Sequence, residues 1–322
     1  MNIFNVIFQS VLALIGIGVI GFWILRRGIL PENVISVLSR LAIDIALPSI
    51  VFANIIINFD PVKYPDWWQL PLYWVLFMAL AFALTLLGLL LSLKSFRGEF
   101  ALSLLFQNGL FFPIIIIAGL FGSDSPYIVQ LFIFIIFHPV LFFSTKHLFF
   151  KTKSDQNDES VLNWQRIINP VLVATLLAIV IVLAGVDKFL PEFVVTMFNM
   201  IGDMTLPLIM IILGGSFYID FQRKGKIFTF EVLKFVFIKN LVFPLVFIAF
   251  LVILQPAYYI ALIMFIQSVV PPITAVPIQV KREGGNESIA NQFLIGSFLF
   301  SIISIPSLFL IFNMFFPATG IN

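Results

Sequence analysis

The chain repeats one pattern of polar and proline residues at an offset of 159 residues, inside segments that are otherwise apolar. The pattern Asp-x-x-Leu-Pro begins at Asp44 and again at Asp203. An amide residue lies at Asn108 and again at Gln267, and a proline follows each of them by five residues. Membrane proteins with such repeats often bind small molecules where interrupted helices meet near the midplane. The repeat therefore predicts two related halves and a site between them.

The composition predicts a chain that is surrounded by lipid. Hydrophobic residues make up 61% and charged residues 11%, against roughly 45–50% and about 25% in soluble domains. Cysteine is absent and histidine occurs twice, which excludes disulfides, zinc fingers and thiolate metal sites. No basic arm or nucleic-acid motif is visible. We therefore expect a polytopic membrane protein in a lipid bilayer, with no cofactor, no metal site and no nucleic-acid partner.

Ten apolar segments have roughly the 20 residues that are needed to cross a hydrocarbon core. In lipid they must be helices, because every backbone polar group needs an internal partner. The predicted spans are residues 3–26, 33–58, 67–92, 99–121, 126–149, 167–186, 192–217, 230–254, 256–279 and 287–316. The fold class expected is therefore all-α, with ten transmembrane helices in two five-helix repeats.

The positive charges predict how these spans are oriented. Alternate loops hold only Lys63 and Lys188, while Arg40 and Lys239 fall inside spans. The remaining loops hold Arg26, Arg27, Lys94, Arg97, Lys146, Lys151, Lys153, Arg166, Arg223, Lys224, Lys226, Lys234, Lys281 and Arg282. Positive charge marks the cytoplasmic side, so both termini should lie outside the cytoplasm, in the plasma membrane (the inner membrane of a bacterium).

The domain organisation follows from the same count of spans. Residues 1–150 form the first repeat, residues 151–166 form a polar cytoplasmic linker, and residues 167–322 form the second repeat. Five spans is an odd number, so the second half should be inverted relative to the first. Inverted repeats of this kind are common in secondary transporters.

The fourth and ninth predicted spans carry the candidate binding residues. Proline removes a backbone donor and glycine weakens a helix, so both spans should be broken near mid-membrane. The residues concerned are Asn108, Gly109 and Pro113 in the fourth span and Gln267, Ser268, Pro271 and Pro272 in the ninth. A half-helix that begins at such a break presents free N–H groups and a partial positive charge. Together with the two amides, this favours a carboxylate ligand; the alternative is a pair of proline kinks without a ligand.

The second and seventh spans hold acidic residues that are candidates for coupling. An acid inside a membrane span is costly and is treated as functional by default. Asp44 and Asp203 could therefore bind a coupling ion. Alternatively, each is a protonated acid or part of a structural ion pair, with Arg40 four residues before Asp44 on the same helical face. Lys239 is the candidate partner of Asp203, unless its side chain reaches the cytoplasmic surface.

His138 is the other candidate for coupling. It lies midway along the fifth span and is followed by proline. An unperturbed imidazole titrates close to neutral pH, so His138 could carry a proton during a transport cycle. The alternative is a neutral histidine that fills a helix interface.

These features together resemble the auxin efflux carrier family, which includes the plant PIN carriers and bacterial permeases assigned to malonate, malate and similar acids. The resemblance rests on the ten spans, the Asp-x-x-Leu-Pro motif at Asp44, the spacing from Asn108 to Pro113, and Pro271-Pro272 followed by a short Lys-Arg-Glu-Gly-Gly turn. It covers essentially the whole chain. This chain departs from the family pattern in two places. Its central loop is short, unlike the long loop of the best-known plant members, and Gln267 stands where a strict repeat of Asn108 would place asparagine.

The resemblance implies the fold of bile-acid/sodium symporters and sodium/proton antiporters, in which two broken helices cross at their prolines. Here the crossing would join Pro113 to Pro271 or Pro272. The function implied is a secondary transporter that moves a small carboxylate such as malate, malonate or an auxin-like acid by alternating access. The alternative is a monovalent-cation/proton antiporter of the same architecture. An enzyme is not expected, because no nucleophile or paired acids mark a catalytic site.

The sequence leaves four properties of such a carrier open. They are the substrate, the direction of transport, the coupling ion (protons or sodium) and the oligomeric state, a homodimer included.

Overall fold

The computed structural model describes residues 3–63, 65–122, 125–145, 149–150, 170–222 and 227–317. The predicted linker at residues 151–166 lies outside these ranges. Within them, all the regular structure is helical, and the only β-type pairing is one isolated bridge between Gln107 and Pro272. The all-α prediction is therefore confirmed for the part of the chain that the structure describes.

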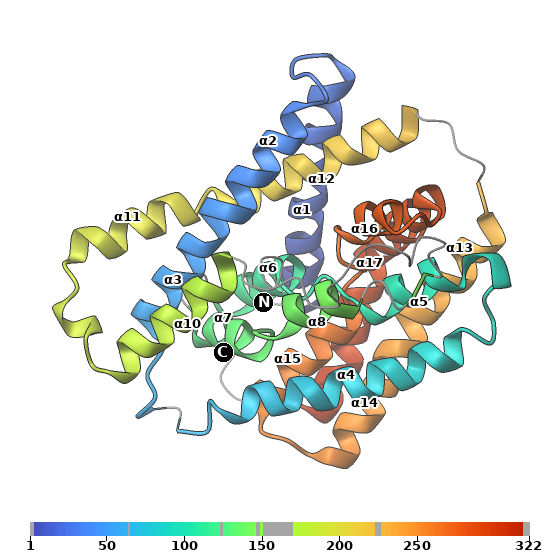
Figure 1. Cartoon of the computed structure of the whole chain (residues 1–322). Helices are drawn as coiled ribbons and strands as arrows, with labels where there is room; N and C mark the ends of the chain where they lie inside the picture. The colour runs from blue at the N-terminus through green and yellow to red at the C-terminus, as the bar shows by residue number, and fades with distance from the viewer. Residues whose placement is uncertain are drawn as a thin grey trace, which may run out of the picture.

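The described helices follow the order of the predicted spans (Figure 1). The first five predicted spans correspond to α1 (Ile3–Arg26), α2 (Val34–Arg40) with η1 (Leu41–Ala46) and α3 (Leu47–Asn58), α4 (Gln69–Gly88), α5 (Arg97–Leu105) with α6 (Phe111–Phe121), and α7 (Pro126–Phe134) with α8 (His138–Thr145). The last five correspond to α10 (Pro170–Leu183), α11 (Glu192–Gly202) with α12 (Thr205–Gln222), α13 (Thr229–Phe237) with η5 (Ile238–Val242) and α14 (Phe243–Leu254), α15 (Tyr258–Val269) with α16 (Val276–Arg282), and α17 (Glu287–Phe315).

Six helical stretches of the described chain are long and apolar enough to cross a membrane. They are Phe4–Arg26, Val34–Asn58, Gln69–Gly88, Glu192–Ile219, Thr229–Leu254 and Glu287–Phe315. The predicted fourth and ninth spans are instead each divided into two short helices, as the glycine and proline residues there predicted. The predicted fifth span is also divided, at residues 135–137 between α7 and α8, where an unbroken span was expected.

The two halves of the chain exchange partners in their packing. Helix α1 packs along α12, and α10 packs along α3, so the first helix of each half lies on the second span of the other half (Figure 1). The same exchange occurs elsewhere, since α5 contacts α17 as α15 contacts α7. Within the halves, α4 contacts α5 as α14 contacts α15. Each of these contacts in one half therefore has a counterpart in the other.

Two of the long helices contain a wider π-helical turn. One is η1, which includes Asp44, and the other is η5, which includes Lys239. A π-turn inserts one residue into an α-helix and is frequent at functional sites. It also rotates the residues that follow it about the helix axis. A continuous 3.6-residue period through η1 or η5 therefore does not predict which side chains of α3 and α14 face the core.

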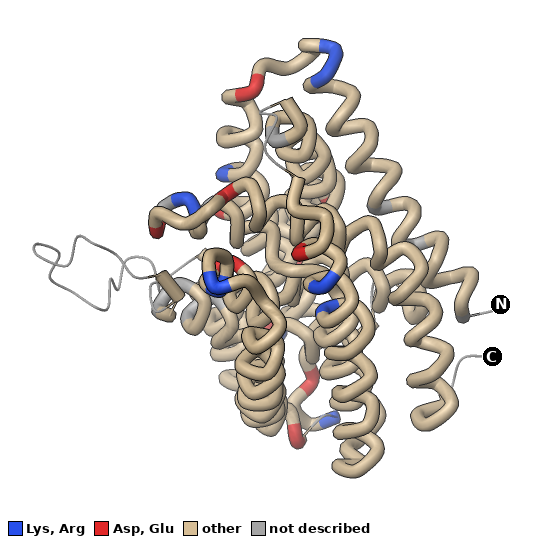
Figure 2. Tube along the Cα trace, turned by 90° about the vertical axis from the view of Figure 1, so that its right-hand side faces the viewer, with Lys and Arg blue, Asp and Glu red and all other residues tan. Residues whose placement is uncertain are grey.

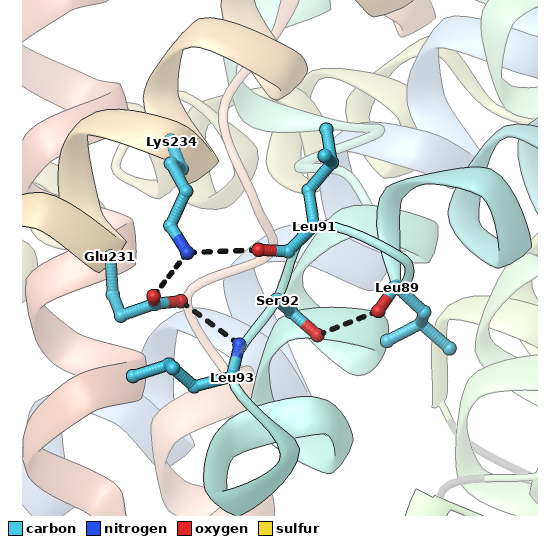
Figure 3. A network of polar contacts seen from close by, with 6 residues as sticks. All are labelled: Leu89, Leu91, Ser92, Leu93, Glu231 and Lys234. Carbon is cyan, nitrogen blue, oxygen red and sulfur yellow. Dashed lines mark hydrogen bonds and ion pairs between the residues drawn. The ribbon is translucent and has the colours of Figure 1, made fainter.

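One end of the bundle is held together by polar contacts between segments far apart in sequence. Glu231 near the start of α13 pairs with Lys234 and accepts a hydrogen bond from the backbone N–H of Leu93, at 3.3 Å (Figure 3). The Lys234 ammonium also donates to the carbonyl of Leu91, at 2.8 Å. Glu99 near the start of α5 accepts from the backbone N–H of Asn286, just before α17, at 2.6 Å. These contacts bring the starts of α5, α13 and α17 to one end of the molecule.

The distribution of charged residues fits this arrangement. Figure 2 shows long stretches of the chain without any Lys, Arg, Asp or Glu, and the charged residues gather mainly at bends and helix ends. Lys281, close to the end of α16, pairs with Glu287 at the start of α17, at 2.9 Å. The loops that the sequence analysis assigned to the cytoplasm thus supply several of the contacts at one end of the bundle.

Glycine allows α1 and α12 to approach closely. An ideal Cβ on Gly214 would lie 1.7 Å from the carbonyl oxygen of Gly18, and one on Gly21 would lie 2.2 Å from that of Ile211. Small residues at helix interfaces let backbones approach in membranes, where packing has to replace the hydrophobic effect. The α1–α12 contact therefore depends on glycine on both helices.

We predict that Gly214→Ala lowers the thermal stability of the purified protein, because its new methyl group collides with the backbone of α1. Gly16→Ala is the matched control, since a Cβ at Gly16 meets no atom within 4 Å. In that helix alanine is favoured over glycine by about 0.5–1 kcal/mol, so the control should be neutral or slightly more stable. The measurement is the melting temperature in detergent, and equal values for the two variants would contradict this packing.

Candidate functional site

Two unwound segments meet inside the bundle and pair through their backbones. One lies between α5 and α6, and the other between α15 and α16. The N–H of Asn108 donates to the carbonyl of Pro271 at 2.7 Å, and the N–H of Ile273 donates to the carbonyl of Phe106 at 3.0 Å. Gln107 and Pro272 lie opposite one another in this antiparallel bridge. The two predicted breaks therefore form one crossing.

The residue that pairs with Pro272 differs from the prediction. Pro113 is the third residue of α6, so it follows the break in the first half. The pairing is made by Gln107, which the sequence analysis did not place in the site. The residues just before Gln107 in the sequence are apolar and give no sign of its role. The pairing of the two segments is what shows that Gln107 lies opposite Pro272 in the other half.

The amide of Gln267 fastens the crossing. Its Nε2 donates to the carbonyl of Gly109 at 2.6 Å, and its Oε1 accepts from Gln107 Nε2 at 3.4 Å. A Cβ on Gly109 would lie 2.8 Å from Gln267 Oε1, so glycine is needed for this approach. Ser268 donates to the carbonyl of Phe265 at 2.6 Å. In this conformation Gln267, Gly109 and Ser268 use their polar groups within the protein.

Asn108 keeps a free donor. Its Oδ1 accepts from the N–H of Phe111 at 3.2 Å and so caps the start of α6. The side chain is only 2% exposed, and its Nδ2 has no hydrogen-bond partner among the described residues. A buried amide N–H without a partner costs about 1–3 kcal/mol. Asn108 therefore presents an unpaired donor at the N-terminus of an 11-residue helix, where the helix dipole favours an anion.

The second half-helix contributes less than predicted. Helix α16 begins at Val276, four residues after Pro272, and has only seven residues. A helix of this length has too small a dipole to attract an anion strongly, so we place no site at its N-terminus. The expected convergence of two helix N-termini is replaced by one N-terminus, that of α6.

The two acids of the repeated Asp-x-x-Leu-Pro pattern are not buried. Asp44 and Asp203 are both exposed on the surface of their helices, although the sequence analysis placed them inside spans as buried acids. In the described chain no ion pair joins Asp44 to Arg40, and Arg40 is exposed too. The π-turn at η1 and the end of α11 at Gly202 direct these acids away from the interior. Both lie on helices other than those of the crossing, and their coupling role stays a prediction.

Lys239 is buried, contrary to the expectation that its side chain reaches the cytoplasmic surface. It has no exposed area, and its Nζ has no hydrogen-bond or ion-pair partner among the described residues. Asp203 is therefore not its partner. The Nζ of Lys239 lies over the ring of Phe243, 4.9 Å from the ring centroid.

His138 lies beside the crossing. Its ring contacts those of Phe106 and Trp74 edge-to-face, with centroids 5.7 and 6.3 Å apart. The imidazole faces the backbone carbonyl of Gln107 and lies within the electrostatic range of Lys239. Neither ring nitrogen makes a hydrogen bond of normal geometry to a described residue. The packing alternative explains the ring contacts, but it leaves both nitrogens without partners.

No group of three or more His, Cys, Asp or Glu side chains that could hold a metal ion occurs within the described ranges.

The chain combines membrane-length apolar helices with two broken helical segments that pair at a buried polar crossing. This combination is typical of polytopic membrane transporters. The comparison with family models agrees, since the model of the membrane transport protein family matches residues 6–309. The chain therefore belongs to this family, the auxin efflux carrier family that its sequence resembles. A search of curated proteins finds no significant match.

We predict that Gln267→Ala destabilises the protein, because it removes the contact to Gly109 and leaves that carbonyl without its partner. An unsatisfied buried group costs about 1–3 kcal/mol, so the melting temperature should fall clearly. Gln69→Ala is the control, since the Gln69 amide contacts Asp66 at the exposed start of α4 and should change stability little. Equal melting temperatures for the two variants would show that the Gln267 amide does not hold the crossing.

Proposed function

We propose that this protein is a secondary carrier that moves a small organic carboxylate across the membrane by alternating access. The observation that carries the proposal is the free Nδ2 of Asn108 at the start of α6, buried at the point where two broken helices cross. An amide donor combined with a helix N-terminus suits a carboxylate oxygen. The family to which the chain belongs supports transport as the activity.

The architecture that we propose is two inverted five-helix repeats. The partner exchange supports it, because α1 on α12 and α10 on α3 are the contacts expected from two related halves. The paired strands at Gln107 and Pro272 would lie on the symmetry axis. In the membrane, we propose that the end of the bundle with the network of Figure 3 faces the cytoplasm, because the cationic loops lie on that side. Both termini would then lie outside.

The crossing is closed to solvent, so transport requires a rearrangement. Gln267 has no exposed area and Asn108 has almost none. An open cavity of about 780 Å³ lies between α12, α13 and α17, close to the charged end of the bundle. Phe217 and Gly296 belong to its wall. We propose that the substrate enters or leaves through this cavity.

Aromatic side chains separate this cavity from the crossing. The ring of Phe217 in the cavity wall contacts Phe298, with centroids 5.7 Å apart. Phe298 in turn contacts Phe112 at 4.9 Å, and Phe112 is the second residue of α6. These three rings join α12, α17 and α6, so a shift of α12 relative to α17 would open the route to Asn108.

The antiporter alternative receives no support from the crossing. A site for a monovalent cation needs a carboxylate or several carbonyl oxygens. The buried ionisable side chains beside the crossing are His138 and Lys239. Glu99 and Glu231, which are also buried, make hydrogen bonds at the charged end of the bundle.

We predict that Asn108→Asp abolishes carboxylate transport while the crossing stays folded. Aspartate keeps an oxygen that can cap the N–H of Phe111, but it replaces the Nδ2 donor with a negative oxygen that repels the substrate. A lost hydrogen bond to a charged group costs about 1.5–3 kcal/mol, so affinity should fall tenfold or more. The measurement is uptake of labelled mono-, di- and aromatic carboxylates into proteoliposomes.

The matched control is Asn33→Asp, which makes the same chemical change at an exposed residue before α2. It should transport like the wild type. Imposed proton and sodium gradients, tested separately, would identify the coupling ion. Normal uptake by Asn108→Asp would place the carboxylate elsewhere, and no uptake of any acid by the wild type would refute the proposed function.

A further inference from the structure

The ammonium group of Lys239 is the least compensated charge in the described core. It is fully buried in the π-turn η5 and contacts the ring of Phe243. An isolated charge in an apolar interior is strongly unfavourable unless it is paired. One aromatic face offsets only part of this cost. The neighbouring Asn240 does not help, because its amide is used in two hydrogen bonds to Ser297, at 3.0 and 2.6 Å.

Other polar groups on this flank of the crossing also lack partners. They are the indole Nε1 of Trp74 and both ring nitrogens of His138. These atoms are buried and make no hydrogen bond of normal geometry to a described residue, although the imidazole faces the carbonyl of Gln107. The rings of Trp74 and His138 are in contact, and His138 lies within the electrostatic range of Lys239. An ammonium and an indole N–H can only donate hydrogen bonds, while a neutral imidazole donates one and accepts one. Donors therefore outnumber acceptors in this set.

No carboxylate of the described core supplies the missing negative charge. Glu99 and Glu231 are committed to contacts at the charged end, with Asn286, Leu93 and Lys234. Asp44 and Asp203 are exposed on helices that do not form the crossing. His138, which interacts electrostatically with Lys239, cannot supply a negative charge either.

We propose that Lys239, with Trp74 and His138, forms a charge-pairing subsite beside the crossing, and that its ligand is an anionic oxygen of the transported substrate. This inference rests on the proposed function and deepens it. In it, Asn108 orients the substrate by a neutral hydrogen bond, and Lys239 makes the site select an anion over a neutral molecule of the same shape. The subsite also gives the loaded carrier a compensated charge in place of a bare ammonium, which lowers the cost of holding that charge within the membrane.

The position of η5 supports this role. Helix α15, which ends at the crossing and carries Gln267, contacts η5. In the other unwound segment, Phe106 lies two residues before Asn108. Its ring packs against that of His138, with the ring centroids 5.7 Å apart. The helix that leads into one unwound segment and a residue of the other segment therefore both contact the subsite.

The test is a binding titration of the full-length protein in detergent with two probes of similar shape, malonate and its neutral diamide, malonamide. The wild type should bind malonate about tenfold or more tightly than malonamide, as expected for a charge-assisted contact. Lys239→Met, an apolar replacement of similar length, should reduce this preference to about twofold or less by weakening malonate alone. Lys188→Met is the matched control, because Lys188 is exposed in a distant loop, and it should keep the wild-type preference.

The stability of the ligand-free protein gives a second readout that a structural role would not produce. Removing an uncompensated buried charge should raise the melting temperature of Lys239→Met by about 2 °C or more. An unchanged preference in Lys239→Met would overturn the inference, and so would a variant that is destabilised or fails to fold, since Lys239 would then stabilise the empty protein. If that occurs while Asn108→Asp still abolishes uptake, the carboxylate carrier stands without this subsite. If the wild type binds neither probe and transports no acid, both proposals fail.

Discussion

The pairing of two unwound backbone segments is the constraint on which the rest of this structure depends. Inside a bilayer no water can satisfy an exposed N–H or carbonyl, so a broken helix survives only where protein covers the break. Here each break covers the other, through Asn108 to Pro271 and Ile273 to Phe106. This arrangement requires the two halves of the chain to meet, and it explains why Gly109 and Gln267 are needed to bring them close enough.

The polar groups at the crossing divide into those that hold it and those that remain free. Gln267 and Gln107 contact one another and the opposite backbone, so their role in this conformation is structural. Asn108 Nδ2, Lys239 Nζ and Gln107 Oε1 are buried without partners in the described chain. Because unsatisfied buried groups cost free energy, their retention is best explained by a function. The first two are donors, and an ammonium carries positive charge, which favours a negatively charged ligand.

Sequence reasoning predicted the crossing well and the acids poorly, for a physical reason in each case. Proline and glycine disrupt a helix through their own covalent geometry, so the breaks near Asn108 and Pro272 could be located without knowing their neighbours. The exposure of Asp44 and Asp203 depends instead on the rotation of their helices, and a π-turn at η1 alters that rotation. The break between α7 and α8 was missed although Pro139 marks it, because its local signal is a single proline without a neighbouring glycine or amide.

The sequence by itself determined that the chain is helical and membrane-embedded, where two of its helices break, and to which family it belongs. Those properties follow from composition, from local backbone chemistry and from the order of motifs along the chain. Only the tertiary structure decided that Gln107 faces Pro272, that Gln267 holds the crossing together, and that Lys239 is fully buried. The reason is that hydrogen-bond satisfaction and burial are set by neighbours that lie more than a hundred residues away along the chain.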